Sequence, residues 1–189
     1  AARIRELSGA AGDIVRNVVR LPGQRVLFLR RKAGENQFKL VLREGTSGGE
    51  RLLVDPEALA REQGVPHAIN YFVPSWDGRT LAYGISAGGS ENASPHLMDI
   101  ASGKALRAPI PRVRQPSPSW SPDSRYLAFN QLRELPPGAP ETETYLDSTV
   151  LRLDRRRPQD APRAARRLRT PGQPGTGVAA AGRGRGAEA

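Results

Sequence analysis

One short stretch of the sequence has the spacing of a catalytic serine. Residues 84–88 are Gly-Ile-Ser-Ala-Gly and fit the pattern G-x-S-x-G. That pattern marks a nucleophile elbow, a strained turn between a strand and a helix that exposes the serine. The residues that follow, GGSENASP (88–95), have the composition of a loop and not of a helix. We therefore predict that Ser86 is a turn serine at the end of a strand and not a nucleophile.

The two histidines do not complete a catalytic set. A serine in such an elbow needs an acid and then a histidine further along the chain, but only Glu91 and His96 follow Ser86 closely, within one hairpin. A triad draws on separate loops, which one hairpin cannot supply. We expect His67 to lie in a strand and His96 to face solvent or a neighbouring sheet. Neither has metal-ligand spacing to other ligands, so we assign no catalytic, cofactor-binding or metal-binding residue.

Two aspartates occupy similar turns and could be imagined as a carboxylate pair. Asp77 lies in an Asp-Gly turn and Asp123 in a Pro-Asp-Ser turn. An aspartate in such a turn accepts hydrogen bonds from its own backbone, so we expect a capping role. Trp76 and Trp120 precede the two turns, and we expect both to pack between sheets and not to bind a ligand.

The composition limits the classes of protein that remain. The 189 residues include no cysteine, 20 glycines and 17 prolines, and the first residue is not Met. The lack of cysteine excludes disulfides and thiolate metal sites, and the glycine and proline content predicts frequent turns. No apolar run approaches the roughly 18 residues of a membrane span. We expect a soluble protein, cytoplasmic or periplasmic, whose sequence begins partway along a longer one.

Segments of this sequence repeat. PSWDGRTLAYGIS (74–86) resembles SWSPDSRYLAFNQL (119–132) at an offset of about 46 residues, and GQRVLFLRR (23–31) is a weaker copy. Residues 37–55 and 96–110, after two of the copies, each have the pattern of a hairpin. The period is that of a β-propeller blade, a four-stranded sheet whose faces are covered only by its neighbours.

We therefore predict an all-β fold, an incomplete β-propeller of about two and a half to three blades of antiparallel four-stranded sheets. Residues 1–22 lead into the first blade, and the partial propeller covers 23–154, with blades near 23–66, 67–112 and 113–154. A short helix at 56–64 lengthens the first unit. An ordinary antiparallel sandwich with accidental internal similarity is the alternative.

Residues 155–189 differ from the rest of the chain. They contain nine arginines and two acidic residues, with much alanine, glycine and proline. Such a segment cannot bury enough apolar surface to fold, so we predict a disordered tail. It would attract phosphates only nonspecifically, and because it has no aromatic side chain to stack on bases we predict no specific nucleic-acid partner. Its composition is also typical of a GC-rich gene translated in a shifted frame.

Several segments together resemble one family. In order they are AGENQFKLVLRE, ERLLVDPEALA, YFVPSWDGRTLAYGISAGGSE, HLMDIASGKAL and PSWSPDSRYLAFNQLRELPPGAPETETYLDSTV. They resemble the N-terminal part of the prolyl oligopeptidase family of serine peptidases, over roughly residues 3–152. The resemblance implies a seven-bladed propeller that caps an α/β-hydrolase domain and admits short peptides only. The family's triad lies in the hydrolase domain, and nothing here matches that domain.

Two hypotheses for function follow. The first is a non-catalytic, substrate-gating propeller of a prolyl-oligopeptidase-like peptidase, with short peptides and a hydrolase domain as partners and with no membrane partner. The second is a protein-binding scaffold without enzymatic activity, because PSWSPDSRYLAF also resembles the repeat of TolB-like propellers. The G-G-S-E stretch and the insertion at 56–64 favour the first. In either case an open sheet edge predicts marginal stability and aggregation in isolation.

Overall fold

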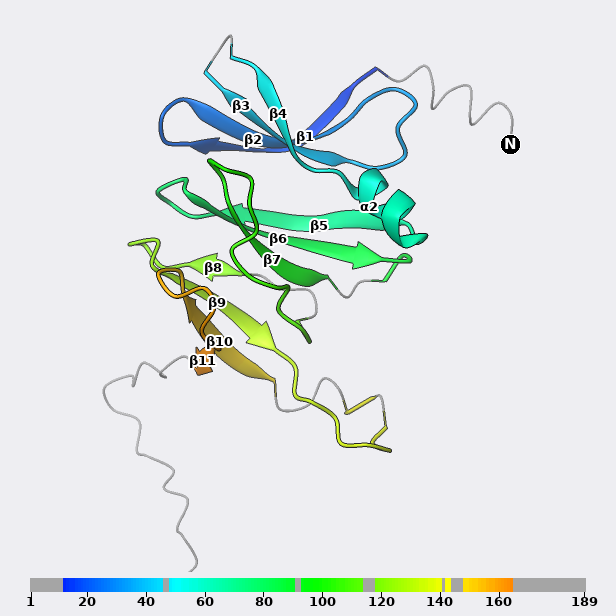
Figure 1. Cartoon of the computed structure of the whole chain (residues 1–189), viewed down its shortest axis with the longest axis vertical. Coiled ribbons are helices and arrows are strands. Elements are labelled where there is room, and N and C mark those ends of the chain that lie inside the picture. The colour runs from blue at the N-terminus through cyan, green and yellow to red at the C-terminus, as the bar shows by residue number, and fades with distance from the viewer. Residues whose placement is uncertain are drawn as a thin grey trace, which may run out of the picture.

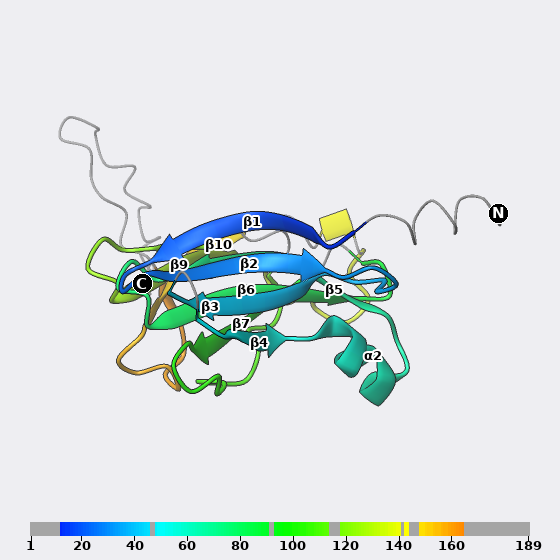
Figure 2. The same cartoon turned by 90° about the horizontal axis from the view of Figure 1, so that it is seen from above.

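Three antiparallel sheets follow one another along the chain. The computed structural model describes residues 12–45, 48–90, 93–113, 118–140, 142–143 and 148–164. Those residues form the three sheets and one α-helix. In Figure 1 the blue sheet, the green sheet and the yellow-to-orange sheet are stacked one on another. Seen from above, the strands of the first sheet overlie those of the second (Figure 2).

The first sheet is a meander in which each strand pairs with the next. Its strands are β1 (Ile14–Leu21), β2 (Arg25–Arg31), β3 (Lys39–Glu44) and β4 (Glu50–Val54). The sheet therefore begins nine residues earlier than the predicted start at residue 23. The reason is a β-bulge in β1, where Asn17 has a left-handed φ of 53° and the pairing shifts between Arg16 and Val19. A bulge interrupts the alternation of inward and outward side chains by which a strand is recognised.

The helix α2 (Pro56–Gln63) joins the first sheet to the second, as the sequence predicts. The carboxylate of Asp55 accepts hydrogen bonds from the backbone N–H groups of Glu57 and Ala58, at 2.9 and 3.2 Å. Pro56 occupies the first turn, where its missing N–H costs nothing. Gly64 ends the helix in the left-handed conformation that such a C-cap requires.

The second sheet has three strands, where the repeat pattern predicts four. They are β5 (His67–Pro74), β6 (Thr80–Ala87) and β7 (Ser94–Asp99). The predicted fourth strand, residues 104–110, runs beside β7 but forms only one β-bridge, between Met98 and Ala105. Pro109 in this segment has no N–H to donate, which limits regular pairing.

The third sheet again has four strands, and they continue past the predicted end of the propeller. They are β8 (Ser119–Trp120), β9 (Tyr126–Gln131), β10 (Thr149–Asp154) and β11 (Arg163–Ala164). β11 pairs with β10, so the sheet extends to residue 164, ten residues into the predicted tail. β11 consists of only two residues, an arginine and an alanine, so no alternation of apolar and polar residues marks it as a strand. The remainder of the predicted disordered tail, 165–189, lies outside the described residues.

The core lies between the sheets and centres on β6. Alternate side chains of β6 point to opposite faces because of the two-residue period of a strand. Leu81, Tyr83 and Ile85 pack against leucines of the first sheet. Ala82 instead lies in a second cluster with Trp120, Leu127, Phe129 and Leu153 of the third sheet.

The prediction of an all-β, incomplete propeller is therefore confirmed. The described residues form successive small antiparallel sheets packed face to face, and they do not close into a ring. A single sandwich would need two sheets over one core, whereas here the second sheet is covered on both faces.

Candidate functional site

Ser86 lies inside a strand and not on an exposed elbow. It belongs to β6, its Cα partner on β5 is Ala68, and it is only 4% exposed. After Ala87 the chain turns, and the N–H of Gly88 donates to the carbonyl of Pro66 at 2.8 Å. The described residues directly after it, 88–90, form a turn and not a helix, so the local geometry does not present the hydroxyl to a substrate.

Both histidines lie on the sheet face opposite Ser86. Paired residues of neighbouring strands share a face, and successive residues of one strand alternate between faces. His96 pairs with Tyr83, and His67 pairs with Ala87. Tyr83 and Ala87 are each an odd number of residues from Ser86 along β6. The backbone of the sheet therefore separates the serine from both imidazoles.

Each histidine has a structural environment of its own. The ring of His96 stacks on Tyr83, with ring centroids 5.0 Å apart and an angle of 18° between the planes. Burial lowers the pKa of His96 below its ordinary value, which favours the neutral ring. Nδ1 of His67 lies 2.6 Å from the carbonyl oxygen of Val65, which can only accept a hydrogen bond.

Packing explains Gly84, the first glycine of the G-x-S-x-G pattern. The ring of Tyr71 lies directly over Gly84, and a Cβ atom added there would stand 2.0 Å from Cε1 of that ring. Residue 84 therefore cannot carry a side chain while Tyr71 keeps this position. Burial raises the pKa of the Tyr71 phenol, whose oxygen has no hydrogen-bond partner among the described residues. Nothing in the sequence pattern distinguishes this packing glycine from a catalytic one.

The Asp77 turn is held by hydrogen bonds within the turn. Ser75 Oγ donates to Asp77 Oδ1 at 2.7 Å, and the N–H of Arg79 donates to the same oxygen at 3.1 Å. The N–H of Thr80 donates to Ser75 Oγ at 2.9 Å. The carboxylate therefore caps its own turn.

The Asp123 turn repeats that arrangement atom for atom. Ser121 Oγ and the N–H of Arg125 donate to Asp123 Oδ1, at 2.5 and 3.0 Å. The N–H of Tyr126 donates to Ser121 Oγ at 2.8 Å. The hydrogen bond from Ser121, together with that from Arg125, lowers the pKa of Asp123. The two aspartates are thus equivalent structural residues in successive sheets.

The two turns also bind the second sheet to the third. The N–H of Asp77 donates to Ser124 Oγ at 3.0 Å, and Arg155 Nη1 donates to Asp77 Oδ2 at 2.6 Å. Burial raises the pKa of Asp77, but hydrogen bonds from Ser75, Arg155 and the Arg79 N–H outweigh it, so the pKa lies below its ordinary value.

The two tryptophans differ from each other. Trp120 is 6% exposed and packs between the sheets, where its indole N–H donates to the carbonyl of Val73 at 3.0 Å. Trp76 was also expected to pack between sheets; its indole N–H donates to the carbonyl of Trp120 in the third sheet at 3.4 Å, but the side chain is 70% exposed. The cause is their position, because Trp120 precedes the turn serine Ser121, whereas Trp76 follows the equivalent Ser75.

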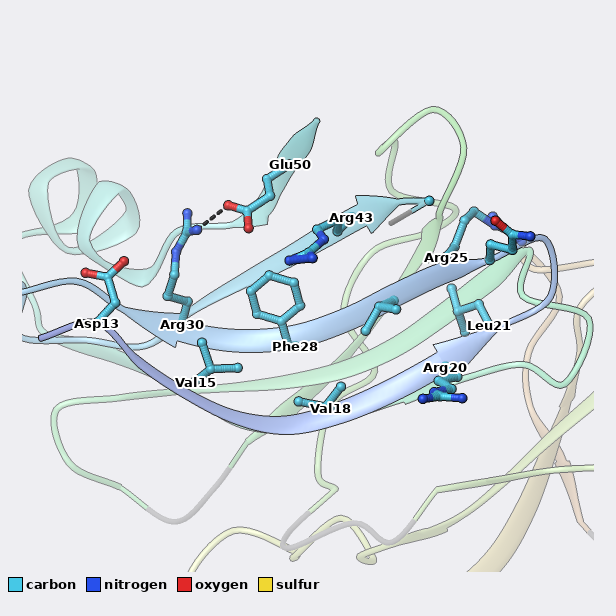
Figure 3. Close-up of a pocket in the computed structure, with 13 residues that line it drawn as sticks. Asp13, Val15, Val18, Arg20, Leu21, Arg25, Phe28, Arg30, Arg43 and Glu50 are labelled. Carbon is cyan, nitrogen blue, oxygen red and sulfur yellow. Dashed lines mark hydrogen bonds and ion pairs between the residues drawn. The ribbon is translucent and has the colours of Figure 1, made fainter. Parts of the chain in front are cut away.

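Two hollows lie on the outer faces of the stack of sheets, one on the first sheet and one on the third. The larger, about 760 Å³, lies on the first sheet, where Val15, Val18 and Phe28 face it and Arg30 pairs with Glu50 at its rim (Figure 3). The second, about 370 Å³, lies on the third sheet and is lined mostly by arginines. Sequence reasoning missed both, because each depends on which strands become neighbours.

Metal clusters and membrane-spanning helices were the remaining features to look for in the described part of the chain. Within it, no group of three or more His, Asp or Glu side chains is arranged to hold a metal ion. No helix in the same residues is long and apolar enough to cross a membrane.

The chain was compared with protein-family models and with solved structures, and both comparisons found similar proteins. Residues 20–163 match the family model described as the prolyl oligopeptidase N-terminal β-propeller domain. A structure from a study of two prolyl endopeptidases superposes with a TM-score of 0.68 at 24% identity, covering 79% of this chain and 23% of that one. Prolyl oligopeptidase B from Galerina marginata, bound to a 25mer macrocyclization substrate, gives 0.64 at 12% identity, covering 81% and 24%. The chain thus spans about a quarter of the length of these proteins, and at such identities the superpositions establish the fold alone.

Proposed function

Because this chain belongs to the family of prolyl oligopeptidase N-terminal β-propeller domains, we propose that it is the non-catalytic, substrate-gating propeller part of a serine peptidase that acts on short peptides. The observation that carries the proposal is the position of Ser86. The serine of the G-x-S-x-G pattern is buried in β6, and both histidines lie across the sheet from it. The chemistry then belongs to a separate hydrolase domain, against which the propeller packs.

The proposed gating follows from how the sheets are built. In each of the three sheets the order of strands is their order along the chain, so β1, β5 and β8 are corresponding edge strands. A propeller arranges its sheets radially around a central channel. An extended peptide can pass along such a channel, whereas a folded domain is too wide. The selection is therefore steric and requires no catalytic side chain in this part of the protein.

An activity assay tests the assignment of roles. We expect the 189-residue chain to produce no turnover of a chromogenic peptide with proline before the scissile bond. The Ser86→Ala variant should behave identically, because that side chain is buried and both histidines lie across the sheet from it. Turnover by the wild-type chain that disappears in Ser86→Ala would refute the proposal.

A further inference from the structure

Two arginines stand directly opposite each other on the third sheet. Arg152 of β10 and Arg163 of β11 are Cα partners in the antiparallel pair, and both are exposed. Like charges at such positions destabilise a sheet. Among the residues that the structure describes, neither arginine forms an ion pair with a carboxylate. Because arginine stays protonated at any physiological pH, the repulsion cannot be relieved by loss of a proton.

The same face carries a marked excess of positive charge. Five arginines and two aspartates line the hollow of about 370 Å³. One of the aspartates, Asp154, is already engaged, because Arg125 donates to its Oδ2 from Nε and Nη2 at 3.2 and 3.0 Å. Only Asp160 then remains to balance the other four arginines of the lining. The hollow is therefore strongly positive.

An aromatic ring holds part of this cluster in place. The guanidinium carbons of Arg125 and Arg152 lie 4.8 and 4.7 Å from the ring centroid of Tyr126. Stacking occupies the face of a guanidinium and leaves its N–H edge available for hydrogen bonds. Arg152 is thus restrained without being neutralised, a condition that reduces the entropy lost when it binds an anion.

We propose that this hollow is an oxyanion-binding site in which a carboxylate or phosphate group bridges Arg152 and Arg163. The planar fork of arginine matches both kinds of group with paired hydrogen bonds. An anion between the two guanidinium groups replaces their repulsion with two attractions. The net positive lining favours a ligand with two or more negative charges.

Calorimetric titration of the full chain with inorganic pyrophosphate and, separately, with citrate tests the site. We expect both to bind at low ionic strength, and the tighter of the two identifies phosphate or carboxylate as the preferred group. The Arg152→Gln/Arg163→Gln variant should bind about tenfold more weakly or worse, since it loses charged hydrogen bonds. The control Arg61→Gln/Arg79→Gln removes the same charge from exposed positions elsewhere and should bind like wild type.

Thermal unfolding separates loss of the site from loss of the fold. Without anion, Arg152→Gln/Arg163→Gln should melt at or above the wild-type temperature, because a like-charge pair is gone. Pyrophosphate should raise the melting temperature of wild type but not of that variant. Arg152→Lys keeps the charge but not the fork, and should also bind more weakly. Equal losses in the control variant, or no binding by wild type at low ionic strength, would overturn the proposal.

Discussion

At the scale of single residues, packing explains what first resembles a catalytic motif. Only glycine fits at position 84, because the Tyr71 ring lies against it, and Ser86 is buried in a central strand. Gly88 occupies a turn with φ of 61°, where a residue without Cβ is favoured. Packing and backbone conformation thus account for all three residues of the G-x-S-x-G pattern, without a catalytic role for any of them.

Gly84→Ala should destabilise the fold. The new methyl group would clash with the Tyr71 ring, and relieving such overpacking typically costs about 1–3 kcal/mol. The free energy of unfolding in urea measures the loss. Gly49→Ala is the matched control, because a Cβ at Gly49 meets nothing within 4 Å and its φ is not left-handed.

A double-mutant cycle ties that cost to one contact. Gly84→Ala combined with Tyr71→Ala should cost less than the sum of the two single changes, because the clash needs both side chains. Strictly additive losses would show that Tyr71 is not the reason for the glycine.

At the scale of elements, the serine–aspartate turns do two things. Within each turn the aspartate accepts from the preceding serine and from the backbone, and these contacts link residues at most five apart. Between sheets, Ser124 and Arg155 of the third sheet bind Asp77 of the second. The first function belongs to a local sequence, and the second joins parts of the chain that are far apart.

The ion pair between Asp77 and Arg155 predicts a pH dependence of stability. The pKa of Asp77 in the folded protein lies below its ordinary value, so the unfolded chain takes up a proton first as the pH falls. The stability that Asp77 supplies is complete above the unfolded pKa of about 4 and is lost as the pH falls through the folded pKa. Asp77→Asn should therefore cost about 1 kcal/mol at neutral pH, a modest value because the pair is partly exposed.

Urea unfolding at a series of pH values checks this prediction. The difference between wild type and Asp77→Asn should shrink as the pH falls below about 4. Asp13→Asn serves as control, since Asp13 accepts no hydrogen bond from the described residues and should leave the profile unchanged. A difference that stays constant down to strongly acid pH would rule out the ion pair as its source.

In the molecule as a whole, the two outer faces of the stack of sheets differ in polarity. The outer face of the first sheet exposes apolar side chains, with Val15 and Val18 51% and 60% exposed (Figure 3). The outer face of the third sheet presents arginines instead. A contiguous apolar face on a soluble domain tends to be covered by a partner. In the isolated chain, the available partner is a second copy.

We expect the isolated chain to self-associate through the first sheet. Val15→Lys/Val18→Lys should shift it toward the monomer, because two added charges on each copy would be brought together across the contact. Sedimentation velocity at several concentrations measures the effect, with Val65→Lys, an exposed position on another segment, as control. A wild-type chain that stays monomeric at high concentration and melts sharply and reversibly would contradict this prediction.

The local structures of this protein and their repetition can be predicted from the order of its residues. The cap at Asp55, the helix that follows and the two serine–aspartate turns form between near neighbours, so their residues specify them wherever they occur. The repeat of about 46 residues indicated successive sheets, and the ordered segments indicated the family.

Which faces and edges these elements share became visible only in the folded protein. The tertiary structure set Ser86 on the opposite side of a sheet from both histidines, left Trp76 exposed and placed Arg152 against Arg163. It also added β1 through a bulge that hides the strand pattern. A two-residue period in the sequence specifies that side chains alternate between the two faces of a strand. Which residues then cover each face depends on strand register and on the stacking of sheets, and both involve residues far apart in the chain.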